Sequence, residues 1–94
     1  MVTDKQNGLP ERTDYSAEDR RFMQMAIELS ERNIDEGGGP FGAVIVRDGK
    51  VVASGANRVV PNNDPTAHAE VSAIRAACAK EQNFKLEGCT CYTS

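Results

Sequence analysis

The chain has 94 residues, of which 39% are hydrophobic and 27% charged, and its formal net charge is −3. This composition is that of an ordinary globular domain rather than of a disordered chain, and the length allows one domain with a modest core. The acidic balance provides no basic surface that would attract a phosphate backbone, so it disfavours a nucleic-acid partner.

Residues 1–15 are polar and lack the apolar run of a signal peptide. We expect them to form a flexible N-terminal lead-in, followed by a single domain over residues 16–94. Three cysteines, Cys78, Cys89 and Cys91, form an odd set without a C-x-x-C pair, which argues against a disulfide framework and a self-contained zinc knuckle. Since no stretch has membrane-spanning length, we expect a cytoplasmic protein without a membrane partner.

A first helix is predicted from Ser16, whose side chain can cap it, to the stop signal EGGGP at 36–40. The run Gly37–Gly39 resembles a phosphate-binding loop only superficially, because it lacks a lysine and precedes a strand. The helix is predicted to carry acids in its first turn, where the helix dipole favours them. Its predicted apolar face comprises Phe22, Ala26 and Leu29, beside Met23, Ile27 and Ile34.

The segment FGAVIVRDGKVVASGANRVV (41–60) gives the strongest hairpin signal in the chain. A β-branched run over Ala43–Val46 is followed by an Asp48-Gly49 turn and by a second β-rich run from Val51. The first run is almost wholly apolar, which is typical of a strand covered on both faces.

A loop rich in Asn and Pro follows, after which Asp64 or Thr66 can cap a second helix running to about Lys80. The apolar face of that helix is predicted to carry Val71, Ile74, Ala77 and Cys78. The final segment NFKLEGCTCYTS is predicted to be a strand, and its alternation places two pairs on opposite faces: Cys89 with Cys91, and Thr90 with Tyr92.

The order helix, strand, strand, helix, strand predicts an α/β fold. The second helix would form a crossover that lays the last strand parallel to a strand of the hairpin. A sheet of only three strands would leave one edge without a neighbour.

The segment DPTAHAEVSAI (64–74) holds the only histidine, His68, two positions before Glu70. This spacing is not the zincin arrangement, since the second ligand would have to stand at Ser72. At a helix start beyond the strand ends, however, both residues would face the cleft in which open α/β sheets bind ligands. There His68 can bind a metal while Glu70 lies beside the metal's water. The structural alternative is that His68 hydrogen-bonds near the helix start and Glu70 is a solvated acid.

Three segments, GGPFGAVIV, NDPTAHAEVSAIRAAC and CTCYTS, resemble the zinc-dependent nucleobase deaminases of the cytidine-deaminase-like superfamily, and within it the guanine deaminases most. The resemblance implies a three-layer α/β/α sandwich, here incomplete, with residues 16–94 as the N-terminal portion of a single deaminase domain. The superfamily signature is H-x-E followed by P-C-x-x-C. The chain has the first motif and reaches Ser94 where the second would begin.

By this resemblance, His68 is a zinc ligand, and Glu70 is the general acid/base that moves a proton from the zinc-bound water to the ring and the departing ammonia. Asn57 matches the residue that hydrogen-bonds the base edge, although an Asn at a strand end also forms turns. Phe41 matches a ring that packs on a purine, with an ordinary core aromatic as the alternative. Ala69 is implied to offer its backbone to the base.

A catalytic zinc needs about three protein ligands, and His68 is one. We expect Zn²⁺ with two further cysteine ligands beyond Ser94. In one alternative Cys89 and Cys91 bind the metal, although the resemblance places them in a buried strand, and Cys78 is expected to be core. In another, a second chain supplies the thiolates.

The resemblance therefore implies a zinc-dependent hydrolase that converts guanine or a related aminated base to xanthine and ammonia when the C-terminal part is supplied. The 94 residues alone are expected to be inactive. The alternatives are a tRNA adenosine or cytosine deaminase, and a non-catalytic fragment that binds a partner through its open sheet edge. The expected partners are a small-molecule purine and either a second copy, giving a homodimer, or the C-terminal part.

Overall fold

The computed structural model of the chain describes residues 2–3 and 16–94. Most of the predicted lead-in, residues 4–15, therefore lies outside the described residues. The elements in chain order are β1 (Val2–Thr3), α1 (Ala17–Asp35), β2 (Gly42–Arg47), β3 (Lys50–Ala56), α2 (Ala69–Glu81) and β4 (Thr90–Thr93).

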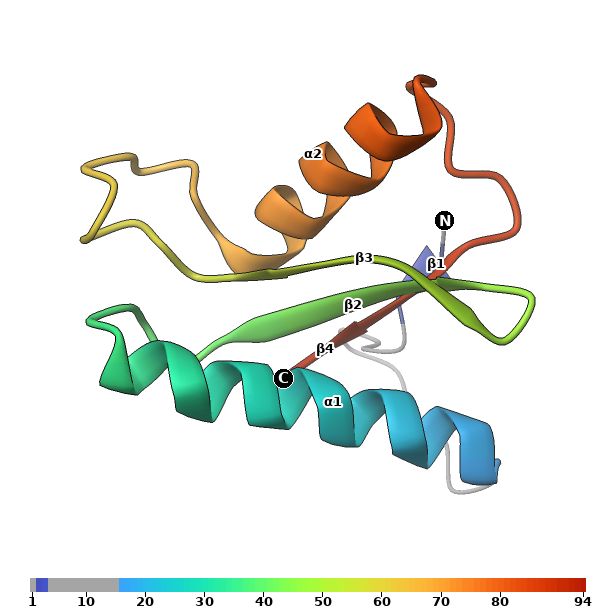
Figure 1. Cartoon of the computed structure of the whole chain (residues 1–94), viewed down its shortest axis with the longest axis horizontal. Coiled ribbons are helices and arrows are strands. Elements are labelled where there is room, and N and C mark those ends of the chain that lie inside the picture. Colours follow the sequence, from blue (N-terminus) through green and yellow to red (C-terminus); the bar gives the residue numbers. More distant parts are fainter. Residues whose placement is uncertain (1, 4–15) are drawn as a thin grey trace, which may run out of the picture.

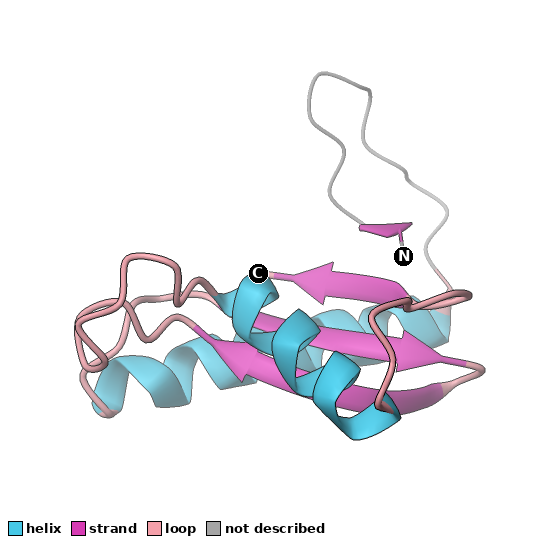
Figure 2. Ribbon diagram, turned by 90° about the horizontal axis from the view of Figure 1, so that it is seen from above, coloured by secondary structure: helices cyan, strands magenta, loops and turns pink. Residues whose placement is uncertain are grey.

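The strands form one sheet in the order β1-β4-β2-β3, with α1 on one face and α2 on the other (Figures 1 and 2). The predicted α/β/α sandwich is confirmed. Neither helix in the described part of the chain has the length and apolar character needed to cross a bilayer.

Helix α1 begins and ends as predicted. The Ser16 hydroxyl accepts a hydrogen bond from the Asp19 N–H at 3.0 Å, and the Asp19 carboxylate accepts one from the Ser16 N–H at 3.2 Å, which together form a capping box. The buried stripe differs from the prediction, because the helix turns toward the sheet along a spacing of four, four and three residues: Phe22, Ala26, Ser30 and Asn33. The predicted Ile27 and Ile34 are exposed instead.

The hairpin of β2 and β3 is confirmed, with Asp48 and Gly49 at φ 51° and 75° in a two-residue turn. Side chains of β2 alternate between two hydrophobic clusters. Ala43 and Ile45 pack on the α2 side, whereas Val44 and Val46 pack on the α1 side. Strand β2 is thus covered on both faces, as its apolar sequence predicted.

Strand β4 pairs antiparallel with β2, from Ala43 opposite Thr93 to Val46 opposite Thr90. It therefore runs parallel to β3 as predicted, with β2 lying between them. The predicted strand was too long, because residues 83–89 form turns and a loop before Thr90. The predicted alternation is confirmed, since Cys91 joins the cluster beneath α2 and Tyr92 the one above α1.

The outer edge of β4 is partly covered by β1, which sequence reasoning did not find. Val2 and Thr3 pair in parallel with Thr90 and Cys91. The edge predicted to be bare is therefore paired over these two positions.

The predicted cap of α2 was wrong. The N-cap residue is His68, and no side chain caps the helix. The Asp64 carboxylate instead accepts hydrogen bonds from the Thr66 N–H and hydroxyl at 2.9 and 2.7 Å, which closes a turn within the preceding loop. These bonds from Thr66 hold the pKa of the Asp64 carboxyl below its usual value.

Helix α2 lies very close to β3. Its buried stripe is made of small residues, Ala69, Ala73 and Ala77, with Ile74 and Cys78 only partly buried beside it. A Cβ atom at Gly55 would lie 2.5 Å from the Ala73 nitrogen and 2.8 Å from the Ala69 oxygen. The absence of a side chain at Gly55 therefore allows the first turns of α2 to rest on the strand backbone.

We predict that Gly55→Ala destabilises the fold by about 1–3 kcal/mol, because the new methyl would overlap the backbone of α2. The matched control is Ser54→Ala at the neighbouring exposed position, expected to change the free energy of unfolding by less than about 0.5 kcal/mol. Urea denaturation measures both. Equal stability of the two variants would contradict the close approach of α2 to β3.

Candidate active site

The candidate site lies at one end of the sheet, where β3 and β4 end, β2 begins and α2 starts. Backbone hydrogen bonds join these segments: Asn57 N–H to the Phe41 carbonyl at 3.1 Å, Arg58 N–H to the Ala67 carbonyl at 2.8 Å, and Ser94 N–H to the Gly42 carbonyl at 3.0 Å. The residues singled out in the sequence, Phe41, Asn57, His68, Ala69 and Glu70, therefore belong to adjoining segments. Ligands of open α/β sheets bind at such an end, outside the carboxyl ends of the strands.

The His68 ring is exposed and makes no hydrogen bond within residues 16–94. Its backbone is extended, at φ −72° and ψ 156°, so the residue stands just outside the helix while preceding its first turn. The alternative prediction, in which the His68 side chain hydrogen-bonds near the helix start, therefore does not match the structure of these residues. Both ring nitrogens are open to a ligand.

Glu70 is exposed in the first turn of α2. Burial, and secondarily the Glu70 charge, raise the pKa of the Cys91 thiol to about 11. The Ala69 methyl is buried in the core at 1% exposure, so only the backbone of Ala69 can face a ligand.

Asn57 has one half of its side-chain amide engaged and the other half open. Its Oδ1 accepts a hydrogen bond from the Val59 N–H at 3.3 Å, the turn predicted as the structural alternative. Its Nδ2 has no partner among residues 16–94, so it can donate to a ligand acceptor.

Phe41 immediately precedes β2. Its ring is 48% exposed and belongs to neither core cluster. A half-exposed ring beside Asn57 is a surface on which a flat heterocycle can stack.

Sequence reasoning missed Asn33 and Arg58. Asn33 is 3% exposed, and its side chain bonds two backbone carbonyls and the Arg58 guanidinium. The available signal was positional, because Asn33 continues the helical stripe of Phe22 and Ala26 as a polar residue.

The described residues do not by themselves form a metal site. No group of three or more His, Cys, Asp or Glu side chains within residues 16–94 is arranged to hold a metal ion. Cys89 and Cys91 are 3% and 0% exposed within the core, and the raised pKa of Cys91 disfavours the thiolate that zinc requires. His68 is the residue that fits a metal ligand here, and the alternative ligands Cys89 and Cys91 do not fit.

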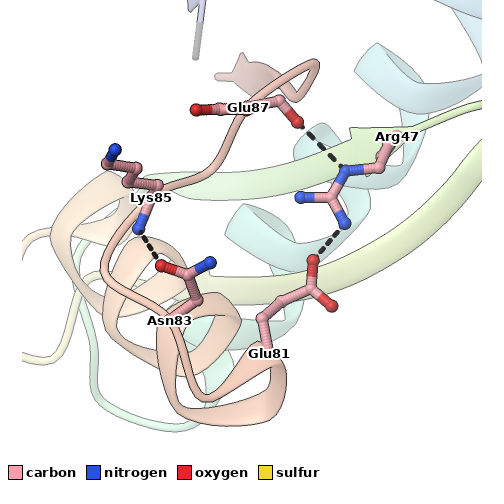
Figure 3. Close-up of a pocket in the computed structure, with 5 residues that line it drawn as sticks. All are labelled: Arg47, Glu81, Asn83, Lys85 and Glu87. Carbon is pink, nitrogen blue, oxygen red and sulfur yellow. Dashed lines mark hydrogen bonds and ion pairs between the residues drawn. The ribbon is translucent and has the colours of Figure 1, made fainter.

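A surface pocket of about 430 Å³ lies at the other end of α2, away from His68 (Figure 3). In it, Arg47 forms an ion pair with Glu81 and donates a hydrogen bond from Nε to the Glu87 carbonyl at 3.1 Å. The ion pair joins the hairpin to the end of α2, and the hydrogen bond joins it to the loop before β4. Both contacts have a structural role.

Comparisons with known proteins agree with the geometry. The family model of the cytidine and deoxycytidylate deaminase zinc-binding region matches residues 16–94. The chain is 51% identical over 74 residues to the guanine deaminase of Bacillus subtilis, covering 78% of this chain and 47% of that protein. It is 38% identical over 73 residues to the tRNA-specific adenosine deaminase of Aquifex aeolicus, covering 78% and 48%.

Solved structures show the same fold. The crystal structure of the Bacillus subtilis guanine deaminase superposes with a TM-score of 0.78 at 50% identity, covering 80% of this chain and 48% of that one. A structure of guanine deaminase from Nitrosomonas europaea gives a TM-score of 0.76 at 36% identity, covering 94% and 50%. The chain therefore spans about half the length of the relatives it matches.

We predict that iodoacetamide at pH 8 leaves Cys91 unmodified in the native protein. A thiol with a pKa of about 11 is ionised to only about one part in a thousand at that pH, and this one is also buried. The half-buried Cys78 serves as the internal comparison, and mass spectrometry of tryptic peptides gives both rates. Modification of Cys91 as fast as that of Cys78 would show that Cys91 is an accessible thiolate.

Proposed function

The chain belongs to the family of the cytidine and deoxycytidylate deaminase zinc-binding region, and from this premise we propose that its protein is a hydrolase converting guanine or a related aminated base to xanthine and ammonia. The observation that carries the proposal is the start of α2, where an exposed imidazole with no hydrogen-bond partner among residues 16–94 stands two residues before an exposed carboxylate. The 51% identity to a guanine deaminase supports guanine as the base.

Zinc is the proposed cofactor, with His68 as one ligand. Bound zinc supplies an acidified water molecule at neutral pH. We place the two remaining ligands on cysteines of a P-C-x-x-C motif after Ser94, because no group of three or more His, Cys, Asp or Glu side chains among the described residues could hold a metal. The 94 residues alone would then be inactive.

Glu70 is the proposed general acid/base. Its carboxylate takes one proton from the attacking water and delivers it to the ring nitrogen next to the amine-bearing carbon. The second proton of the water passes by the same carboxylate to the amine, which leaves as ammonia while the new oxygen stays on the ring. The exposure of Glu70 at the helix start leaves its carboxylate free to reach both positions.

Three further groups are proposed to hold the base. The Asn57 Nδ2, which has no partner within residues 16–94, donates a hydrogen bond to the base edge. The exposed Phe41 ring packs against the heterocycle. The Ala69 backbone contributes from the first turn of α2, where N–H groups have no partner inside the helix.

A tRNA adenosine deaminase is the second candidate, because the chain is 38% identical to such an enzyme from Aquifex aeolicus. The net charge of −3 favours a free base over a polyanionic substrate. Ammonia release from guanine, compared with inosine formation in tRNA by the same protein, separates the two. Activity on neither substrate would favour the non-catalytic, partner-binding alternative.

The remaining edge of β4 is the proposed contact for either a second copy or the C-terminal part. Among the described residues, β1 pairs with Thr90 and Cys91 of β4, and we propose that the later residues of the strand accept another neighbour.

We predict that Glu70→Gln in the full-length protein lowers kcat with guanine by about 10²–10⁴-fold, because the amide cannot move protons, while the zinc content stays unchanged. The control is Glu87→Gln, an exposed carboxylate whose residue makes its described contact through the backbone. That variant should keep kcat within about twofold. Ammonia release measures both, and wild-type kcat in the Glu70 variant would rule out the assigned role.

We predict that His68→Ala abolishes stoichiometric zinc binding, because two remaining ligands do not retain the ion through dialysis. Ser72→Ala, one helical turn further along α2, is the control and should hold about one zinc per chain. Elemental analysis by mass spectrometry gives the ratio. Full zinc occupancy without His68 would place the metal elsewhere.

A further inference from the structure

Asn33 joins three segments of the chain through one buried amide. Its Nδ2 donates to the Gly39 carbonyl at 2.9 Å and to the Asn57 carbonyl at 2.6 Å, and its Oδ1 accepts from the Arg58 guanidinium at 2.8 Å. At 3% exposure, both donors and one acceptor position of this amide are satisfied by protein. Such a saturated buried polar group fixes its partners in one arrangement.

The two segments held by Asn33 are those that carry the proposed base-binding groups. The Gly39 N–H donates to the Asn57 carbonyl at 3.3 Å, and the Asn57 N–H donates to the Phe41 carbonyl at 3.1 Å. The stretch leading to Phe41 and the backbone of Asn57 therefore form one cross-linked unit. Asn33 lies beneath this unit and touches neither the Phe41 ring nor the Asn57 side chain through any described hydrogen bond.

The loop passes so close to Asn33 that only glycine fits above it. A Cβ at Gly38 would lie 2.2 Å from the Asn33 Nδ2, and the Gly38 N–H donates to the Asn33 carbonyl at 2.8 Å. Contact with the Asn33 amide therefore fixes how closely the loop backbone at Gly38 packs on the end of α1.

Arg58 extends the same network to the start of α2. Its guanidinium is bound to Asn33, while its backbone N–H donates to the carbonyl of Ala67 at 2.8 Å, next to His68. The network therefore connects the groups proposed to hold the base with the residue proposed to hold the metal.

We infer that Asn33, supported by Arg58, is a positioning residue that sets the Asn57 side chain and the Phe41 ring at the distance and angle at which a purine fits between them and Glu70. This inference rests on the proposed function. It assigns Asn33 no contact with the substrate, so its effect must pass through Asn57 and Phe41.

The test is a double-mutant cycle in the zinc-loaded, full-length protein. Asn33→Asp keeps the shape of the side chain but sets a carboxylate against two carbonyl oxygens, so both donated hydrogen bonds are lost. Asn57→Ala removes the side chain that would read the base, together with its hydrogen bond from the Val59 N–H, and leaves the backbone carbonyl that Asn33 binds. The cycle therefore separates action through Asn57 from general disruption.

Asn33→Asp should lower kcat/KM for guanine by about tenfold to a hundredfold in the otherwise wild-type protein, as misplacement of a substrate-holding group does. In the Asn57→Ala background the loss should be clearly smaller, because one of the two groups that Asn33 positions is gone and only the part that passes through Phe41 remains. Zinc content should be the same in all four proteins. Equal losses in the two backgrounds, or no loss in either, would overturn the inference.

Two further variants guard against misfolding. Arg58→Met removes the hydrogen bond to Asn33 and a 3.9 Å ion pair with the exposed Glu36 from a side chain that is already 32% exposed, and it should show the same non-additivity with a smaller loss. Ser30→Ala is the matched control, because Ser30 is buried one turn earlier and bonds only the Ile27 carbonyl of its own helix. It should keep kcat/KM within about twofold, and a loss as large as that of Asn33→Asp would overturn the inference.

If the wild-type protein deaminates no base, the proposed function fails, and hydrogen exchange then decides about the network. Asn33→Asp should speed exchange of the Gly39 and Asn57 amides at least about tenfold relative to Ser30→Ala, because the loop loses its buried anchor. Unchanged exchange at both amides would overturn the positioning role independently of catalysis.

Discussion

The contact between α2 and the backbone of β3 at Gly55 is the constraint on which the site depends. A side chain at Gly55 would meet the backbone of α2 at 2.5 Å, so the helix can rest there only because the residue is glycine. That contact fixes the first turns of α2 against the sheet, and the first turn carries Glu70 with His68 immediately before it. The placement of the proposed catalytic pair thus follows from a strand residue that takes no part in chemistry.

On the opposite face of the sheet, a strand glycine likewise allows close helix packing. A Cβ at Gly42 would lie 2.3 Å from the Ala26 carbonyl oxygen of α1, so α1 also rests against strand backbone. Since α1 ends with Asn33 in its last turn, its close packing brings that amide beneath the loop of Gly39. Two glycines on neighbouring strands therefore position the two helices whose ends build the site.

Much of the fold could be predicted from the sequence because its signals are local. The Ser16 cap, the Asp48-Gly49 turn and the alternation of Cys91 and Tyr92 each depend on a few neighbouring residues, and all are confirmed. The predicted cap of α2 failed for a related reason. Asp64 has the side chain of a cap, but Thr66 lies nearer and engages it in a turn before the helix begins.

Residues of the candidate site also differ in whether local sequence could identify them. The pair of His68 and Glu70 could be found from a short motif, since both belong to one stretch of chain. Asn33 could not, because its partners lie 6 and 24 residues away along the sequence, and nothing local indicates that a buried amide meets their carbonyls. The same limit applies to the alanine stripe of α2, since small residues are chosen there by the nearness of β3 rather than by hydrophobic periodicity.

Relatives with different named substrates each match 78% of the chain, and this bears on which groups select the base. A guanine deaminase and a tRNA-specific adenosine deaminase align over 74 and 73 residues respectively. This chain holds the imidazole of His68 and the carboxylate of Glu70 at the start of α2, and in the proposed mechanism these two groups need only an amine-bearing carbon beside a ring nitrogen. Chemistry common to several bases therefore belongs to α2, whereas discrimination belongs to the groups that meet the rest of the heterocycle. The groups proposed to do so lie on the loop of Phe41 and at the end of β3. The buried amide of Asn33 bonds the backbone of both segments, so under this proposal a change at Asn33 would alter substrate preference without a contact to the base.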